Sequence, residues 1–471
     1  MTASNDTESN SNVRSALEAA GKVYDTAGIS RRVSQITISA IKEMPLLASK
    51  IDGCVSLGQG IPSFPTPEHI REAICRVMRE DGESGKYTLG PGMPALRQAV
   101  ARHLLADRGI QADPDTELCM TAGAMEALSA AVLTVVDRGE EVILPSPNYA
   151  SHIEQVLLAE GVPVFAPLTK SDWQLDPEAI RTAISPRTKA MILCNPHNPT
   201  GANWSRESLA EVARIAAENN LFVIADETYD FLAYDGQSTV SLTSFPELRD
   251  RLIAVFSFSK KYAMTGWRIG YVYAPAPILD QIMKVHDAVV ICAPTLAQHA
   301  ALAALEGPQD CVEEIRKALQ DRRDLVCSRL DRMSDHFSYV VPRGAYYLMA
   351  RYNAPGVDSM AYALRLLNEA RVITIPGAAF GPDGEGHIRI SFGGSEEEIG
   401  DAFDRIEKWV SQDPFGIAPP PPAPEEPPVR EEQEQPLPEE PAVPEKAAPK
   451  PRKKAKPGPQ QMAIDWGKPK K

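Results

Sequence analysis

Four short apolar runs separated by helical patterns are the feature that most constrains the fold of this 471-residue chain. The runs are EEVILP (140–145), KAMILCNP (189–196), FVIADE (222–227) and LIAVFSFS (252–259), each bounded by polar or turn residues. Between the second and the third lies SRESLAEVARIAAENN (205–220), which has apolar residues at helical spacing and opens on Ser205 as a candidate N-cap. Repeated strand, helix, strand units predict an α/β fold, in which helices cover both faces of a parallel sheet.

The composition is that of a globular protein with no membrane segment. The chain is 43% hydrophobic and 24% charged, and its length suits two domains rather than one. No stretch approaches eighteen uncharged apolar residues, and the opening MTASNDTESNSN lacks the basic and apolar parts of a signal peptide, so we expect a cytoplasmic protein that binds no membrane. The seven cysteines are odd in number and form no CxxC pair, which argues against both a disulfide framework and a metal site.

Charge and proline content set the C-terminal 60 residues apart. Residues 412–471 hold ten acidic and ten basic residues, so the net charge of −14 arises within residues 1–411, and so acidic a body is a poor candidate for binding nucleic acid. Seventeen of the 41 prolines also lie in 412–471, as in PPPPAPEEPP. We expect a disordered tail there, rich in Pro and Glu and then in Lys, and a disordered extension over residues 1–30. The basic stretch PRKKAKP either contacts a polyanion or the acidic body, or is simply solvated.

Polar clusters follow three of the apolar runs. NPHNPTG (195–201) follows the second run, DETYD (226–230) ends the third, and Lys260 follows the fourth. Ligands of parallel sheets bind beyond the carboxyl ends of the strands, so these residues are candidates for one site. Each has an ordinary explanation as well: a carboxylate that caps a strand, a turn, or a lysine with its amine in solvent. TAGAMEALSAA (121–131) is either a phosphate-binding helix start or an ordinary one.

The stretch SFSKKYAMTGWRIG (257–270) resembles the pyridoxal-phosphate attachment signature of the class I and II aminotransferases. Other segments follow in that family's order, namely LGQGIPSFPTP, YTLGPGMPALR, TAGAMEAL, PSPNYASH, NPHNPTG, DETYDFLAYDG, PRGAYYLM, IPGAAFG and IRISFG. The resemblance implies the fold-type I architecture, with a mostly parallel seven-stranded sheet in a large domain and a smaller α+β domain. The expected bounds are 61–299 for the large, cofactor-binding domain, and 31–60 with 300–411 for the small one.

The same resemblance assigns roles around the cofactor ring. Lys260 is similar to the lysine that forms an imine with the cofactor aldehyde and then carries a proton. Asp226 occupies the motif position of the carboxylate that keeps the pyridine nitrogen protonated. Asn198 and Tyr229 would hydrogen-bond the ring oxygen, and Tyr149 resembles the aromatic residue that stacks on the ring face. Lys260, Asp226 and Tyr229 are therefore the expected catalytic residues.

The cofactor phosphate needs cations and hydrogen-bond donors. By the same resemblance Arg268 supplies a guanidinium, Ser257 a hydroxyl, and Ala124 and Met125 the amides of a helix start. Tyr87 resembles the tyrosine that reaches the phosphate from the neighbouring subunit. This resemblance implies a homodimer with shared active sites.

Arg389 resembles the arginine that grips the substrate α-carboxylate, beside the Gly60 backbone and Asn198. The implied activity is that of a pyridoxal-phosphate-dependent aminotransferase of amino-acid metabolism and biosynthesis, which moves the amino group of an L-amino acid to a 2-oxo acid such as 2-oxoglutarate by a ping-pong mechanism. A β-eliminating carbon–sulfur lyase on the same scaffold is the alternative. A cofactor-binding regulator would need a DNA-binding module, for which thirty N-terminal residues are too few. The uncharged Met125, with Ile61 near the pocket glycine, favours an apolar or amphipathic donor, and aspartate stays open.

Overall fold

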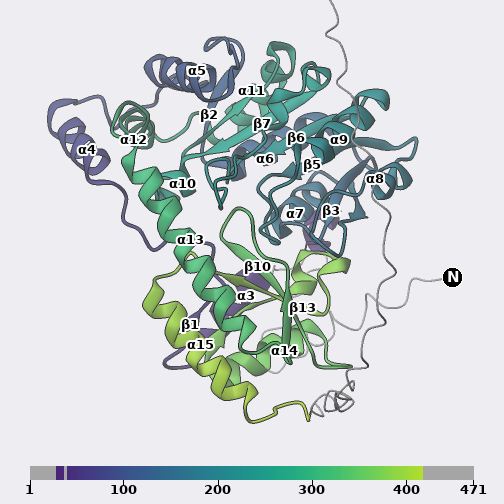
Figure 1. Cartoon of the computed structure of the whole chain (residues 1–471). Helices are drawn as coiled ribbons and strands as arrows, with labels where there is room; N and C mark the ends of the chain where they lie inside the picture. Colours follow the sequence, from purple (N-terminus) through teal and green to yellow (C-terminus); the bar gives the residue numbers. More distant parts are fainter. Residues whose placement is uncertain (1–27, 37–39, 417–471) are drawn as a thin grey trace, which may run out of the picture. The chain divides into compact units, whose positions relative to one another are not determined.

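The computed structural model describes residues 28–36 and 40–416, which carry a seven-stranded, a four-stranded and a two-stranded sheet (Figure 1). Most of the two predicted disordered extensions, 1–30 and 412–471, lies outside the described residues. Within the second, residues 412–416 are described, and the Phe415 ring stacks on Tyr362 with 5.1 Å between ring centroids. The predicted domain bounds stay a prediction.

The seven-stranded sheet has the order β2-β8-β7-β6-β5-β3-β4. Its strands are β2 (Leu118–Thr121), β3 (Glu141–Ser146), β4 (Val162–Pro167), β5 (Thr188–Cys194), β6 (Phe222–Asp226), β7 (Leu252–Ser257) and β8 (Gly270–Tyr273). The pairs from β7 to β4 are parallel, whereas β8 pairs antiparallel with both β7 and β2. The mostly parallel seven-stranded sheet predicted above is confirmed, and the four apolar runs are β3, β5, β6 and β7.

Both faces of this sheet are buried, because neighbouring residues of each strand enter different cores. On β6, Val223 packs in one hydrophobic cluster and Ile224 in the other. The flanking helices are α4 (Glu68–Glu80), α5 (Pro94–Arg108), α6 (Ala124–Val135), α7 (Ala150–Leu158), α8 (Pro177–Ala183), α9 (Arg206–Glu218), α10 (Phe258–Lys261), α11 (Ala276–Val290) and α12 (Thr295–Glu306). Ser205 caps α9 as predicted, since its side chain accepts a hydrogen bond from the Ser208 amide.

The four-stranded sheet has the order β12-β13-β10-β9 and is antiparallel throughout. Its strands are β9 (Phe337–Tyr339), β10 (Tyr347–Tyr352), β12 (Ile375–Pro376) and β13 (His387–Ser391), and β1 (Val55–Ser56) pairs separately with β11 (Val372–Ile373). The remaining helices are α2 (Arg31–Ser34), α3 (Ala40–Ala48), α13 (Asp310–Asp331), α14 (Ser359–Arg365), the π-helical η4 (Leu366–Ala370) and α15 (Glu396–Val410), and the 3-10 turns are η1 (Leu242–Ser244), η2 (Pro246–Leu248), η3 (Thr265–Trp267), η5 (Gly377–Phe380) and η6 (Pro382–Gly384). Strand β1 thus pairs with a strand more than 300 residues later in the sequence.

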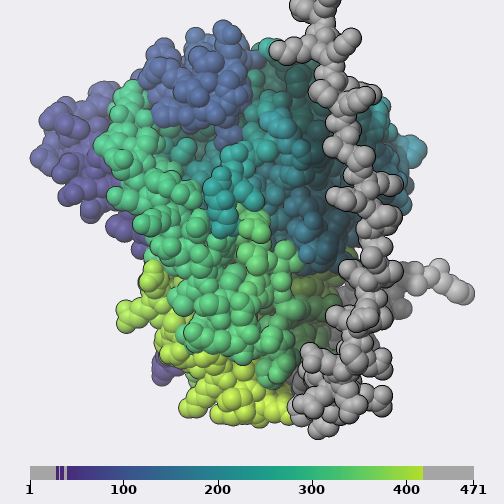
Figure 2. Space-filling model, viewed as in Figure 1, coloured from purple at the N-terminus to yellow at the C-terminus, as the bar shows by residue number. Residues whose placement is uncertain are grey.

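Helix α12 packs against elements from much earlier in the chain. Figure 2 shows the green side chains of this region directly beside those of α4, in purple, and α5, in blue, both of which α12 contacts. No helix in residues 28–36 and 40–416 is long and apolar enough to cross a membrane.

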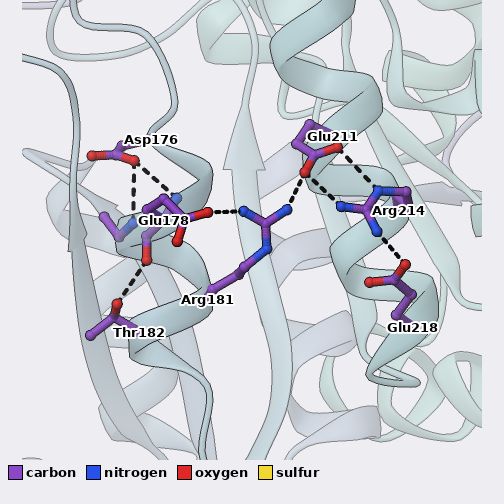
Figure 3. Close-up of polar contacts among 8 residues, drawn as sticks. Asp176, Glu178, Arg181, Thr182, Glu211, Arg214 and Glu218 are labelled. Carbon is purple, nitrogen blue, oxygen red and sulfur yellow. Dashed lines mark hydrogen bonds and ion pairs between the residues drawn. The ribbon is translucent and has the colours of Figure 1, made fainter.

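A chain of ion pairs links α8 and α9 on the outside of the large sheet (Figure 3). Arg181 pairs with Glu178 and with Glu211, and Arg214 pairs in turn with Glu211 and Glu218. These side chains are substantially exposed, so the network adds little stability and is weakened by salt. It involves none of the residues predicted to bind the cofactor or substrate.

Candidate functional site

A cavity of about 250 Å³ lies at the carboxyl ends of β5, β6 and β7. Its lining includes every predicted site residue except Tyr87: Gly60, Ala124, Met125, Tyr149, Asn198, Asp226, Tyr229, Ser257, Lys260, Arg268 and Arg389. The rule that ligand sites follow the strand ends therefore places the cavity correctly. A group of three or more His, Cys, Asp or Glu side chains able to hold a metal ion is not found in the described part of the chain.

Lys260 stands on α10, the short helix that follows β7. The Ser257 hydroxyl opens this helix by accepting a hydrogen bond from the Ser259 amide, which turns the Lys260 side chain into the cavity. The Lys260 Nζ donates to the Gly60 carbonyl at 2.6 Å. Burial lowers the pKa of Lys260 to about 8, and the charges of Arg268 and Arg389 act in the same direction. The amine can therefore exchange a proton near neutral pH.

Asp226 ends β6 and is nearly buried. Its Oδ2 lies 3.2 Å from His152 Nε2, and its Oδ1 accepts from the Thr228 amide at 3.1 Å and the Thr228 hydroxyl at 2.5 Å. Burial by itself raises the pKa of Asp226, but the His152 and Thr228 contacts outweigh it and hold the pKa below its usual value. The carboxylate stays ionised inside the cavity.

His152 is a residue that sequence reasoning missed as a site residue. It lies within the quoted segment PSPNYASH, and its Nδ1 is 3.0 Å from Asn148 Oδ1, which also accepts from the Tyr149 amide at 2.6 Å. Asn148 thus orients the ring that contacts Asp226. The signal was a histidine one helical turn after Tyr149, within a segment already assigned to the site.

Arg268 and the start of α6 form the cationic end of the cavity. A Cβ at Gly123, whose φ is +80°, would lie 2.5 Å from Arg268 Nη2, so only glycine lets the guanidinium approach the helix start. No hydrogen bond from the amides of Ala124 or Met125 is found among the described residues. A cation, two free amides and the nearby Ser257 make a donor set suited to a phosphate.

Arg389 is a second cation, buried on β13 with 1% of its surface exposed. Its Nη2 donates to the Gly58 carbonyl at 2.6 Å and its Nη1 to Asn198 Oδ1 at 3.2 Å, while its Nε has no partner. Within residues 28–36 and 40–416 no carboxylate forms an ion pair with it. A buried guanidinium without a counter-ion can donate its hydrogen bonds to a carboxylate ligand and so bind it.

Phenols line the wall between these groups. The hydroxyls of Tyr229 and Tyr347 lie 2.9 Å apart, and burial raises the pKa of Tyr229 well above its usual value, so it is a neutral donor. A Cβ at Gly60 would lie 2.1 Å from the Tyr347 hydroxyl, which explains the glycine there. The Tyr149 ring meets His152 edge-on, with 5.4 Å between centroids.

Tyr87 alone is not brought into the cavity. It lies between α4 and α5 with 79% of its surface exposed. The expectation for this residue concerned the site of a neighbouring subunit, so its absence from the cavity of its own chain leaves that expectation a prediction.

Comparison with known proteins agrees with the geometry. The family model for aminotransferase class I and II matches residues 52–406. The chain is 36% identical over 387 residues to aromatic-amino-acid aminotransferase 2 of Thermococcus litoralis, and 36% over 389 residues to an aspartate aminotransferase of Pyrococcus abyssi, covering 82% of this chain and 98% of each relative. The solved aspartate aminotransferase of Thermus thermophilus with maleate superposes with a TM-score of 0.76 at 34% identity, covering 81% of this chain and all of that one.

Proposed function

Because this chain belongs to the class I and II aminotransferases, a family that depends on pyridoxal 5′-phosphate, we propose that Lys260, Asp226 and Arg389 carry amino transfer in the cavity described above. The chain is a transaminase of fold type I, as predicted. The relatives compared above are aminotransferases, so the alternative of a carbon–sulfur lyase is not favoured.

The residues of the cavity fit the cofactor. Arg268, Ser257 and the amides of Ala124 and Met125 would hold its phosphate, and Asp226 its ring nitrogen. When bound, pyridoxal phosphate supplies an aldehyde that an amine can attack and a ring that takes up electron density from the substrate α-carbon. Asn198 and Tyr229 would hydrogen-bond the ring oxygen, and Tyr149 would cover the ring face.

The protein's own contribution is charge placement and proton transfer. The observation that carries the proposal is one buried amine, Lys260, set between two cations that are available for two different anions. Arg389 would bind the substrate α-carboxylate in the same cavity that the Lys260 amine lines, and so would hold the substrate near this amine. Lys260 would take the α-proton at its nitrogen and deliver it to the cofactor carbon that carried the aldehyde, and the Asp226 carboxylate would stabilise positive charge on the ring nitrogen. The direct test is whether an amino acid alone changes the absorbance of the bound cofactor, as the first half of a ping-pong reaction requires.

The cavity is partly apolar. Ile41, Met125 and Leu128 line it, and the only cations in its described lining are Lys260, Arg268 and Arg389, each of which has another role in this proposal. We therefore propose a donor with an uncharged, aromatic or aliphatic side chain. The names of the relatives include both aromatic and aspartate aminotransferases and do not decide the matter.

A panel of amino acids tests the donor class. Phenylalanine or leucine should show a kcat/KM at least about tenfold above that of aspartate, because a distal carboxylate would be buried without a cation. Met125→Lys should raise kcat/KM for aspartate by about tenfold or more by adding a charged hydrogen-bond donor, whereas Met125→Leu should not. Equal use of aspartate by the unmodified enzyme would contradict the proposal and point to a cation from a second subunit.

We also propose a homodimer with shared sites. The apolar side chains of Ile61, Tyr87, Leu89, Val289 and Ile291 are 48% to 79% exposed, as is typical of a surface that another molecule covers. Ile61 also lines a hollow of about 620 Å³, together with Phe64, Trp267 and Leu296 among others. A second copy of the chain is the occupant that would also bring Tyr87 to a phosphate site. The cytoplasmic location stays part of this proposal.

Mixed dimers test the shared site. If Tyr87 serves the other subunit, a dimer of one Tyr87→Phe and one Lys260→Ala subunit contains one site with both changes and one with neither. Half of its sites should then retain cofactor and turn over as in the unmodified enzyme, while Tyr87→Phe homodimers should bind cofactor about tenfold more weakly because each site loses a hydrogen bond to a charged group. Two singly damaged sites in every mixed dimer would exclude sharing.

A further inference from the structure

His286 joins two segments that the mechanism above does not connect. It stands near the end of α11, which packs on α6 (Figure 1), and its side chain is fully buried. Its Nδ1 lies 3.2 Å from Glu126 Oε1 on α6, and its Nε2 lies 3.0 Å from the Gly90 carbonyl in the 86–93 loop. One imidazole therefore bridges a helix and a loop that are 36 positions apart in sequence.

Both neighbours of the ring are hydrogen-bond acceptors. Gly90 offers a carbonyl oxygen, and the Glu126 carboxylate already accepts from the Ala122 amide through its other oxygen at 3.2 Å. A neutral imidazole carries one N–H and can donate to only one of the two, whereas a ring with both nitrogens protonated donates to both. The ring thus has an acceptor facing each of its two nitrogens, the Glu126 carboxylate at Nδ1 and the Gly90 carbonyl at Nε2.

The Glu126 end of the bridge supports the phosphate end of the cavity. Glu126 holds the Ala122 amide, one residue before the Gly123 turn and two before Ala124, which lines the cavity. An anion held by the amides of Ala124 and Met125 would order this turn. The Glu126 carboxylate would be ordered with it, since its backbone belongs to the same helical turn.

The Gly90 end of the bridge supports the loop that presents Tyr87. Two further residues hold this loop from α12: Thr295 donates to the Lys86 carbonyl at 2.5 Å, and Gln298 donates to the Thr88 hydroxyl at 2.8 Å. These contacts fix the loop near its start, other hydrogen bonds hold its end at Pro91, Gly92 and Met93, and His286 contacts it between the two, at Gly90. Tyr87 itself is exposed, so the loop rather than its own packing determines where the phenol lies.

We propose that His286 is a positioning residue that couples the phosphate end of its own cavity to the Tyr87 loop and, through that loop, to the cofactor site of a second subunit. The last step rests on the proposed function, in which Tyr87 reaches the other site; the coupling within one chain does not. Ordering of the 122–126 turn by an anion steadies Glu126, then His286, then the loop. Cofactor in one site should therefore raise the affinity of the other by about fivefold, the lower end of measured coupling between sites.

Hydrogen exchange in the cofactor-free protein tests the coupling within one chain. Glu126→Gln should raise the exchange rates of the 86–93 amides by about tenfold, although it touches none of them. Its side chain has an acceptor at only one of the two positions at which the Glu126 oxygens contact His286 and the Ala122 amide. His286→Gln should do the same, and the double variant should add nothing further. His103→Gln, whose ring bonds the Leu305 carbonyl instead, is the matched control and should leave the loop unchanged. The proposal would be overturned if the effects of the two substitutions on the 86–93 exchange rates added in the double variant, or if Glu126→Gln left these rates unchanged. Should His286→Gln fail to fold, the Glu126→Gln result decides the matter by itself.

Titration with pyridoxal phosphate tests the coupling between subunits. The unmodified dimer should bind its second equivalent more tightly than its first, and His286→Gln should bind two independent equivalents. The hydrogen-exchange results can match the expectation while the two sites of the unmodified dimer bind cofactor with equal affinity. That outcome would overturn the connection between subunits. The mixed dimers of Tyr87→Phe and Lys260→Ala subunits then show which hypothesis is wrong. If every site carries one change, Tyr87 does not serve the other subunit. If half of the sites behave as in the unmodified enzyme, the shared site stands and the His286 coupling is wrong.

Discussion

Lys260→Ala should abolish amino transfer while leaving a folded protein. Lys260 is the only amine that lines the described cavity, and in the proposed mechanism it is both the attachment point of the cofactor and the carrier of the proton. Loss of a positioned acid–base group alone lowers kcat by about 10²- to 10⁴-fold, and loss of the covalent attachment adds to that. Single-turnover kinetics with the preferred donor measure the effect.

Folding of this variant is expected because the lysine is not a stabilising residue. Burial lowers the pKa of Lys260 from its usual 10.5 to about 8, so between these pH values the unfolded chain binds more protons than the folded one. Stability therefore rises with pH over this range, and below about pH 8 the folded chain carries the full cost of the buried ammonium. The lysine therefore lowers stability at neutral pH, and its removal should not lower the melting temperature. Lys261→Ala, which changes a lysine outside the cavity lining, is the matched control and should turn over normally. Near-normal turnover by Lys260→Ala would remove the proposed mechanism.

The lowered pKa has its own consequence for reactivity. In the cofactor-free protein the Lys260 amine becomes neutral as the pH rises through about 8, whereas ordinary lysines remain charged until near 10.5. Modification of the chain with an amine reagent, followed by peptide mapping, should find Lys260 half-reactive near pH 8. Half-reactivity near pH 10 would show that the amine is in contact with water.

Periodicity was sufficient to predict the sheet, because burial on both faces leaves a signature in each strand. The runs at 140–145, 189–196, 222–227 and 252–259 are nearly continuous apolar segments, and each forms a strand of the large sheet. The N-cap of α9 was also predictable from local sequence, because a serine just before a helical apolar pattern can accept a hydrogen bond from a free amide of the first turn. The antiparallel direction of β8 was not predicted, because side-chain alternation is the same in either direction.

Contacts that assemble the cavity could not be predicted in this way. Lys260 meets the Gly60 carbonyl across 200 residues, and Arg389 meets the Gly58 carbonyl across 331. Their approach depends on how the two sheets pack, which no local pattern records; the residues were named from resemblance to a family. His286 was not named at all, because its role lies in bridging α6 and the 86–93 loop and appears only when both partners are seen.

Asp226→Asn should lower kcat by about 10³-fold, the size of effect expected when a preorganised charge is removed from an active site. The Asp226 carboxylate is ionised despite its burial, because His152 and Thr228 hold its pKa below the usual value. An amide of the same shape keeps the contact with Thr228 but offers no negative charge to hold a proton on the cofactor ring nitrogen. Stopped-flow measurement of the half-reaction with the preferred donor separates this loss from any change in cofactor affinity.

The neighbouring Glu227 supplies a matched control for Asp226. It is equally buried, but it bonds Ser241 at 2.7 Å and the Leu242 amide at 3.1 Å, does not line the cavity, and burial raises its pKa to about 7. Glu227→Gln should therefore keep near-normal turnover, whereas His152→Gln should fall between Glu227→Gln and Asp226→Asn, because it removes only the support of the carboxylate. Equal losses in Asp226→Asn and Glu227→Gln would mean that turnover depends on the total negative charge at the end of β6 rather than on the Asp226 carboxylate in particular, and the role assigned to Asp226 would be wrong. If Asp226 acts on the ring nitrogen, turnover should fall most in Asp226→Asn, less in His152→Gln and hardly at all in Glu227→Gln.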